Sequence, residues 1–367
     1  MIEGIVPAEI RAEGQAIRAT LAGSLPAAQA AAEALRAAEV RRIYVTGNGS
    51  SYHSAMAAAT LYRHLATADD PTVIALDAGE FRNYLPGLDR SDALIGISAS
   101  GEFRDVLVVV DDLRDRIPTV GIVHVPGSTL ARIAAHAVLS YGGSSGVPVM
   151  TKTFVATLAA THLVLGELLG GARAQGVRAA LAAAADDVEA AVAGAAPRVE
   201  CLADALATVE HIFVVGSGNA AAAAYEAALK LKEMALVHAE GAESWEMATG
   251  GATIVGPDSV VVALAPAGPG REATLDFARH ADGWGARIVE VGPGETPAIE
   301  GADHLRLPAT AAEDYASLAA VAPVALLAFV LARRRGFNPD RPGWVDRYHS
   351  QGLRHIVGVG RTAEGRA

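Results

Sequence analysis

Cysteine is almost absent from this sequence, in which Cys201 is the only one among 367 residues. A single cysteine provides neither an intramolecular disulfide nor a multi-cysteine metal site. Proteins of the reducing cytosol commonly lack a disulfide framework. We therefore expect a cytoplasmic protein that is stabilised by its hydrophobic core without covalent cross-links.

An excess of basic charge is lacking as well. The chain has 30 Lys and Arg residues against 41 Asp and Glu residues, which gives a formal net charge of −11. Nucleic acids are bound mainly through clustered basic side chains, so no nucleic-acid partner is expected. An anionic substrate would have to be held by a local site.

The sequence also lacks clear membrane signals. Residues 1–14 have no basic flank followed by an apolar run, so no signal peptide is predicted. The most apolar stretch, residues 316–332, is short, contains Pro323 and is followed by arginines at 333–335. We expect it to be a buried core helix rather than a membrane span, and we expect no membrane partner.

What the sequence does contain is an alternation of short apolar runs with helical patterns. The run Arg42–Thr46 is followed by a glycine and hydroxyl turn, Gly47–Ser51, and a helical pattern. Residues 8–38 are predicted to be helical around a break at Gly23–Pro26. Further predicted elements are strands 93–97 and 119–123, turn 98–101, helix 102–114, a short helix and apolar segment within 129–140, and helix 151–169. This alternation predicts a parallel sheet covered on both faces.

The second half repeats the first. IYVTGNGSS at 43–51 matches IFVVGSGNA at 212–220, and LIGISASG at 94–101 matches VVALAPAG at 261–268, at an offset of about 168 residues. The repeat predicts an α/β protein with two tandem doubly wound parallel-sheet domains of the three-layer, flavodoxin-like kind. The predicted layout is an N-terminal helical arm (1–38), a first domain (39–170), a helical connector (171–205), a second domain (206–336) and a C-terminal tail over the active site (337–367).

The two copies differ at their strand-to-helix turns. The first copy has Ser50, Ser51, Ser98 and Ser100, where the second has Asn219, Ala220, Ala265 and Ala267. Hydroxyls and free N–H groups at helix N-termini beside parallel strands suit a phosphate. Glycine and serine also shape turns and cap helices without any ligand. Because the duplicate lacks these hydroxyls, we favour a phosphate site in the first copy.

The second copy has a charged helix face instead. Residues 220–237 are predicted to be a helix, on which Glu226, Lys230 and Glu233 follow at steps of four and three and share one face. A carboxylate beside a cation and partly out of water can serve as a proton-shuttling base. A solvated ion-pair ladder is the alternative. The first copy has no counterpart, so we expect one copy to anchor the substrate and the other to supply the chemistry.

Longer motifs carry a resemblance over nearly the whole chain. They are GSSYHSAM at 49–56, ISASGE at 97–102, MTKTF at 150–154, EAALKLKEMALVHAE at 226–240 and NPDRP at 338–342. With these motifs the chain resembles the sugar isomerase (SIS) family, in particular the isomerase half of glucosamine-6-phosphate synthase and its stand-alone relatives. The resemblance implies a homodimer that acts on sugar phosphates and needs no metal or organic cofactor for isomerisation.

The resemblance also implies residue roles. Ser50, Ser51, Ser98 and Ser100 fall on the family's phosphate-binding turns, and Gly49 and Thr151 are further expected substrate contacts. Glu233 falls on the proton-transfer base and Lys230 on a neighbouring site lysine. Interconversion of an aldose and a ketose moves a proton between C1 and C2, which one carboxylate can do. A nearby cation would stabilise the developing oxyanion.

Several positions depart from the family pattern. Thr249 stands where the family has the histidine that helps to open the sugar ring, and Arg347 stands where it has the lysine of the C-terminal tail. At the phosphate turn, Ala99 and Phe103 stand where the family has a glutamine and a threonine. Arginine keeps its proton, so Arg347 is expected to contact substrate rather than to form an imine or act as a base. Acid–base catalysis could instead be carried out by Glu246, His238, His349 or His355, although a single histidine is more often structural. Trp245 and Trp344 could line a sugar pocket or could simply belong to the core.

Three functions remain open at this stage. The leading hypothesis is an aldose/ketose isomerase of a sugar phosphate or amino-sugar phosphate, with or without amination or deamination at C2. The alternatives are a deglycase or deaminase of a specialised sugar derivative and a non-catalytic sugar-phosphate sensor. The resemblance includes no glutamine-hydrolysing domain, so the chain is not expected to make its own ammonia from glutamine.

Overall fold

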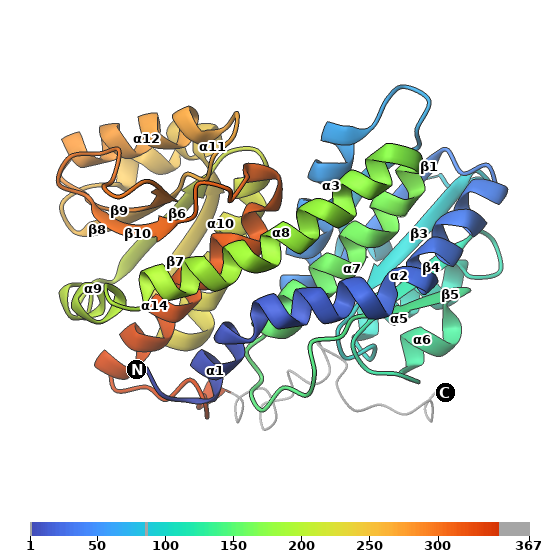
Figure 1. The fold of residues 1–367 in the computed structure, drawn as a ribbon, viewed down its shortest axis with the longest axis horizontal. Helices are drawn as coiled ribbons and strands as arrows, with labels where there is room; N and C mark the ends of the chain where they lie inside the picture. The colour runs from blue at the N-terminus through green and yellow to red at the C-terminus, as the bar shows by residue number, and fades with distance from the viewer. Residues whose placement is uncertain (1, 85–86, 345–367) are drawn as a thin grey trace. The chain divides into compact units, whose positions relative to one another are not determined.

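The computed structural model describes residues 2–84 and 87–344 (Figure 1). These residues form two compact units. The first-sheet unit consists of the described residues of Ala19–Gly142, Ala156–Arg178 and Gly343–Ala367. The second-sheet unit consists of the described residues of Met1–Arg18, Gly143–Val155 and Ala179–Pro342. The domain boundaries expected from the sequence stay a prediction.

The first-sheet unit is built on five parallel strands. They are β1 (Arg42–Gly47), β2 (Thr72–Asp77), β3 (Asp92–Ile97), β4 (Thr119–Val123) and β5 (His136–Leu139), in the order β2-β1-β3-β4-β5. In the central register, Val45 is paired with Ala75 on one side and with Ile95 on the other. The crossover helices are α3 (Ser50–Leu65), α4 (Ala78–Asn83), α5 (Arg104–Leu113) and α6 (Thr129–Ile133).

The second-sheet unit has the same topology. Its strands are β6 (His211–Gly216), β7 (His238–Glu243), β8 (Ser259–Leu264), β9 (Arg287–Pro293) and β10 (Asp303–Leu307). The sheet order β10-β9-β8-β6-β7 is the order of the first sheet read from the other edge. Its helices are α9 (Val199–Ala205), α10 (Asn219–Ala235), α11 (Ser244–Thr249), α12 (Arg271–Gly283), α13 (Ala316–Ala319) and α14 (Val321–Arg334). The predicted pair of tandem doubly wound domains is therefore confirmed.

The remaining helices are α1 (Ile5–Arg11), α2 (Glu13–Ala37), α7 (Lys152–Leu169) and α8 (Gly171–Ala195). The predicted break at Gly23–Pro26 is wrong, because α2 is continuous and contains Pro26. A proline inside a helix costs about 3 kcal/mol. Burial of the next turns, where Ala28, Ala31 and Leu35 are at most 1% exposed, stabilises the helix beyond the proline.

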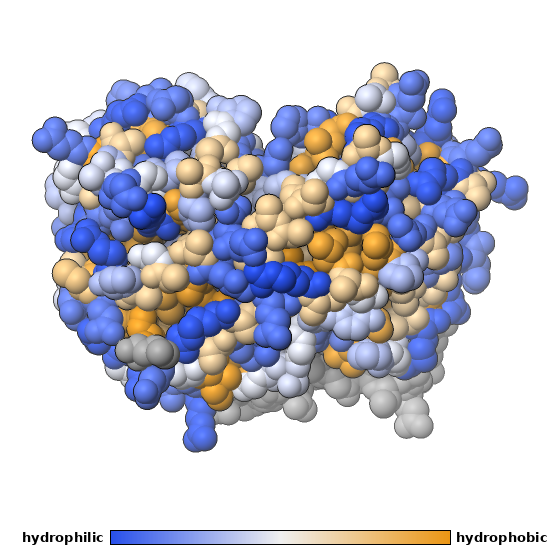
Figure 2. All heavy atoms as spheres, in the orientation of Figure 1, coloured by the Kyte–Doolittle hydropathy of each residue, from blue (hydrophilic) through white to orange (hydrophobic). Residues whose placement is uncertain are grey.

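Two helical segments are long and apolar enough to cross a membrane by length and composition, Lys152–Leu169 and Glu313–Arg334. In each of them 94% of the most apolar stretch is buried inside the fold. The prediction of a buried core helix over residues 316–332 is therefore confirmed, and packing accounts for the apolar composition of both segments. The face drawn in Figure 2 mixes hydrophilic side chains with smaller apolar patches.

Candidate functional site

Helix α10 carries the charged face predicted from the sequence. It begins after Gly218, whose φ of 62° is in the left-handed region that favours glycine, and ends before Leu236, which adopts the left-handed conformation with φ 49°. Its first turns, Ala220–Ala224, are buried. An alanine-rich helix approaches its neighbours closely because alanine has little side-chain volume, and α10 packs against β6, β7 and α14.

Three charged side chains of α10 form one connected group, which we call the α10 triad: Glu226, Lys230 and Glu233. The Lys230 ammonium lies 3.1 Å from the Glu226 carboxylate and 2.6 Å from the Glu233 carboxylate. The side chain of Glu226 is 0% exposed and that of Lys230 is 1% exposed, whereas that of Glu233 is 25% exposed. The predicted shared face is therefore observed, and the alternative of a solvated ladder does not describe it.

The ammonium of Lys230 also donates a hydrogen bond to the Met150 carbonyl oxygen at 3.0 Å. Burial by itself lowers the pKa of Lys230, but the carboxylates of Glu226 and Glu233 more than offset this and hold the pKa above its ordinary value of 10.5. Lys230 is therefore a permanent cation at physiological pH. It faces two carboxylates, and only Glu233 also reaches solvent.

This arrangement suits proton transfer by Glu233. A fixed cation stabilises the ionised form of a neighbouring carboxylate, which is the form that accepts a proton. The same cation would lie close to negative charge that develops on a substrate oxygen. Glu226 has no exposed surface, so it can balance the charge of Lys230 but cannot itself touch a ligand.

Sequence reasoning missed a third acidic residue, Glu13 at the start of α2, which interacts electrostatically with Lys230 and Glu226 of the triad. Its side chain is buried, with the residue only 3% exposed, and its Oε2 has no hydrogen-bond partner among the described residues. Burial raises the pKa of Glu13 well above its ordinary value of 4.5; Glu226 and Glu9 raise it further, and Lys230 opposes them. Glu13 is therefore expected to be neutral in the folded protein at a pH where it ionises in the unfolded chain.

Replacing Glu13 by glutamine is expected to stabilise the protein increasingly as pH rises above about 4.5. Below that pH both folded and unfolded chains hold the proton, so the substitution has little effect. Above it only the unfolded chain ionises, and wild-type stability falls by about 1.4 kcal/mol per pH unit up to the raised pKa. Urea unfolding between pH 4 and pH 8 measures this gap. Glu33→Gln, at an exposed position of α2, is the control, and parallel curves for E13Q and wild type would contradict the assignment.

Thr151 lies next to the carbonyl that Lys230 contacts. It is 3% exposed, and its hydroxyl has no hydrogen-bond partner among the described residues. A buried hydroxyl without a partner is costly and is uncommon in proteins. Its placement is compatible with the predicted substrate contact, which stays a prediction.

The other sequence candidates of the second copy are more exposed. Glu246 and Thr249 lie on the surface of α11, where the Thr249 hydroxyl donates to the Glu246 carbonyl oxygen at 2.7 Å. Trp245 is 67% exposed. His238 is at the amino end of β7, with its Nδ1 3.4 Å from that of His211. Trp344 is partly buried. Arg347, His349 and His355, which the sequence analysis names as candidates, lie outside the described residues.

The serine turns of the first copy follow β1 and β3. These strands are neighbours in the sheet, and β1 is also paired with β2, so the strand order reverses between β1 and β3. Ligands of doubly wound sheets bind outside the carboxyl ends of the strands at this switch point. Gly49, with φ 53°, turns the chain into α3, and Ser50 and Ser51 are 6% and 7% exposed in its first turn.

The turn after β3 is held by its own hydroxyls. The Gly101 N–H donates to Ser98 Oγ at 3.1 Å, and the Glu102 N–H donates to Ser100 Oγ at 3.2 Å. Ser98 is buried and Ser100 is exposed. These bonds fix the position of both hydroxyl oxygens, which suits a preformed anion site but also explains the turn without a ligand. The phosphate roles of the four serines stay a prediction.

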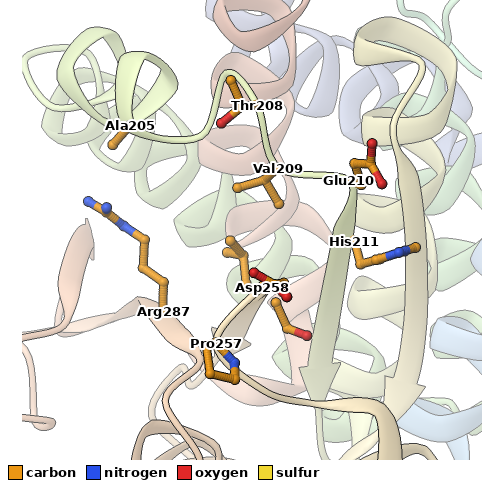
Figure 3. Close-up of a pocket in the computed structure, with 10 residues that line it drawn as sticks. Ala205, Thr208, Val209, Glu210, His211, Pro257, Asp258 and Arg287 are labelled. Carbon is orange, nitrogen blue, oxygen red and sulfur yellow. The ribbon is translucent and has the colours of Figure 1, made fainter.

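A cavity of about 570 Å³ lies elsewhere in the second-sheet unit, at the amino ends of β6, β8 and β9 (Figure 3). Glu210, His211, Asp258 and Arg287 are among the residues that line it. None of the predicted site residues lines this cavity. Because ligands of parallel sheets bind at the carboxyl ends of the strands, we do not assign the substrate to it.

Comparison with known proteins supports a family assignment. The model of the SIS domain matches the chain twice, over residues 37–165 and 205–330. A glutamine–fructose-6-phosphate aminotransferase (isomerizing) from Pyrococcus horikoshii is 31% identical over 341 residues, which cover 91% of this chain and 55% of that protein. The chain thus spans about half the length of this curated relative.

Solved structures share the fold. The C-terminal domain of the glucosamine-fructose-6-phosphate aminotransferase from Francisella tularensis aligns with a TM-score of 0.84 at 23% identity, over 93% of this chain and 99% of that one. Tagatose-6-phosphate ketose/aldose isomerase from Escherichia coli aligns with a TM-score of 0.74 at 20% identity, over 93% and 95%. The chain belongs to the SIS domain family, as predicted from its motifs.

Proposed function

We propose that this protein is an enzyme that isomerises a sugar phosphate or amino-sugar phosphate by moving a proton between C1 and C2. The observation that carries the proposal is the α10 triad, in which a buried ammonium holds a partly exposed carboxylate at 2.6 Å. Glu233 is the base, and Lys230 stabilises negative charge on the adjacent oxygen. The similarity to an isomerizing aminotransferase and the shared fold with a ketose/aldose isomerase support this reaction type.

In the proposed mechanism the serine turns of the first copy hold the phosphate. Helix N-terminal N–H groups and hydroxyls bind the anion, which positions the sugar carbons for proton transfer. Ser50, Ser51, Ser98 and Ser100 are the proposed contacts, together with Gly49 and Thr151. No metal or organic cofactor is needed for this proton transfer.

The runner-up within enzymes is a deaminase or deglycase of a specialised sugar derivative. It is considered because the resemblance implies that Thr249 stands where the synthase has its ring-opening histidine, which argues against the synthase reaction itself. Incubation with hexosamine 6-phosphates separates the two reactions, since only a deaminase releases ammonia. A sensor would bind such compounds without turnover of any of them.

Replacing Ser98 by alanine is expected to weaken binding of the substrate phosphate. Loss of a hydrogen bond to a charged group costs about 1.5–3 kcal/mol, which is roughly a tenfold loss of affinity or more. A thermal-shift panel of hexose and hexosamine 6-phosphates first identifies a ligand, and calorimetry then compares S98A with wild type.

Ser91→Ala is the matched control, because Ser91 precedes the amino end of the same strand and contacts Asp89 rather than the turn. Equal affinities for wild type, S98A and S91A would remove this turn from the phosphate site. A response to no phosphorylated sugar at all would indicate a substrate without a phosphate. We also propose that the protein is cytoplasmic and forms a homodimer. Sedimentation analysis of the purified chain tests the dimer.

A further inference from the structure

The turns of the second copy surround a side chain of the same unit, Glu313. This residue follows β10 and is 7% exposed. Its Oε2 accepts a hydrogen bond from the Gly270 N–H at 2.5 Å, immediately before α12. Its own N–H donates to the Ala267 carbonyl oxygen at 2.9 Å, and the Ala267 N–H donates to the Ala311 carbonyl oxygen at 3.3 Å. The segment that carries Glu313 is therefore fixed along the turn after β8.

Three glycines bring the backbone of both turns against the Glu313 side chain. A Cβ atom added to Gly218, in the turn after β6, would collide with Glu313 Oε1. A Cβ at Gly268 would collide with the Glu313 Cβ, and one at Gly270 would lie 2.9 Å from Oε2. An anion site requires backbone that an oxyanion can approach without intervening side chains. The glycine turns beside the N-termini of α10 and α12 provide such backbone around Glu313.

A neighbouring hydroxyl adds an independent observation. Ser217 is 5% exposed, and its Oγ has no hydrogen-bond partner among the described residues. Its Cβ lies within 2.9 Å of the position that a Cβ of Gly270 would occupy, so Ser217 adjoins the peptide that holds Glu313. An unsatisfied buried hydroxyl beside two helix N-termini is a further donor for an oxyanion.

The two copies differ in what occupies these strand-to-helix turns. Ser98 and Ser100 of the first copy correspond to Ala265 and Ala267, so the second copy lacks these hydroxyls. It has the glycine turns and the helix N-termini, and a buried carboxylate contacts them. The second copy thus provides its own anion at the place where a doubly wound sheet binds one.

We propose that the second copy contains an anion site that the Glu313 carboxylate fills. The chain therefore binds its anionic substrate with the first copy only, and removal of the carboxylate opens the second site to inorganic phosphate. The statement about the first copy rests on the proposed function, whereas the occupancy of the second site by Glu313 does not.

Calorimetric titration with inorganic phosphate tests the proposal on wild type, Glu313→Ala and Glu313→Gln. We expect E313A to bind one more phosphate per chain than wild type. E313Q is expected to bind no extra phosphate, because its amide still fills the space. Adding Ser98→Ala and Ser100→Ala to E313A should remove the first-copy site and leave the new one. A crystal of E313A grown with phosphate should show the anion at the N–H of Gly270.

The outcomes separate the two proposals. If wild type binds one phosphate and folded E313A also binds one, the second site is not an anion site and the inference is overturned. If wild type binds none and E313A binds one, the inference stands and the first-copy phosphate site fails. If E313A is unstable, millimolar phosphate should raise its unfolding temperature more than that of wild type, and an equal rise would overturn the inference.

Discussion

Replacing Glu233 by glutamine is expected to abolish solvent-deuterium exchange at C1 or C2 of the substrate and to lower turnover by about 10²–10⁴-fold. Glutamine is nearly isosteric with glutamate but does not accept the proton. Binding should survive, because the proposed phosphate contacts lie in the first copy. The measurement is exchange in deuterated buffer, followed by NMR, together with the binding affinity for the same compound.

The control for this experiment is Lys232→Gln on the same helix. Lys232 is exposed, whereas Glu233 bonds to the buried Lys230, so the control tests whether any change on α10 affects activity. The folded state of E233Q is checked by its unfolding temperature. Deuterium exchange at the wild-type rate in folded E233Q would show that another group is the base.

Replacing Lys230 by methionine is expected to lower the free energy of unfolding by about 3–5 kcal/mol. The substitution leaves Glu226, which is 0% exposed, and Glu233 without the cation between them. Removing one partner of a buried ion pair leaves an uncompensated charge, and the cost of that charge outweighs the similar volume of methionine. Urea unfolding at neutral pH measures the loss, and activity should fall with it.

Two further variants show whether charge pairing causes the effect. Lys232→Met removes an exposed lysine from the same helix, so its effect should stay within about 0.5 kcal/mol. The double variant Glu226→Gln with Lys230→Met removes the buried carboxylate as well and should regain part of the loss. If K230M is no less stable than K232M, the triad is not the coupled group described above.

Much of the fold could be predicted from the sequence, because the signals are local and occur twice. The strand after Arg42 and its duplicate after His211 show the same apolar run and glycine turn, and the copies support each other without any alignment. Strand β7 could not be predicted in this way, because HAEGAE has few β-forming residues. It becomes a strand through its pairing with β6, and such pairing is decided by tertiary structure.

The charged face of α10 was also predictable, since residues three and four apart on any helix lie on one face. Its burial was not predictable. Spacing alone does not distinguish a solvated ladder from a lysine that is 1% exposed. The Met150 carbonyl contacts Lys230 from a segment 80 positions away, and Glu13, more than 200 positions away, interacts with Lys230 electrostatically. No local sequence pattern predicts such long-range neighbours.

The sequence by itself determined the family, the duplication, the parallel sheets and the helix on which the acidic and basic side chains alternate. These features follow from residue periodicity and from the order of motifs, which are properties of the linear sequence. The tertiary structure alone decided that Lys230 is enclosed by acids, that Glu13 is buried without a full set of partners, and that Glu313 lies in the turns of the second copy. Burial and long-range contacts set the charge state of an ionisable group, so these features exist only once the chain is packed.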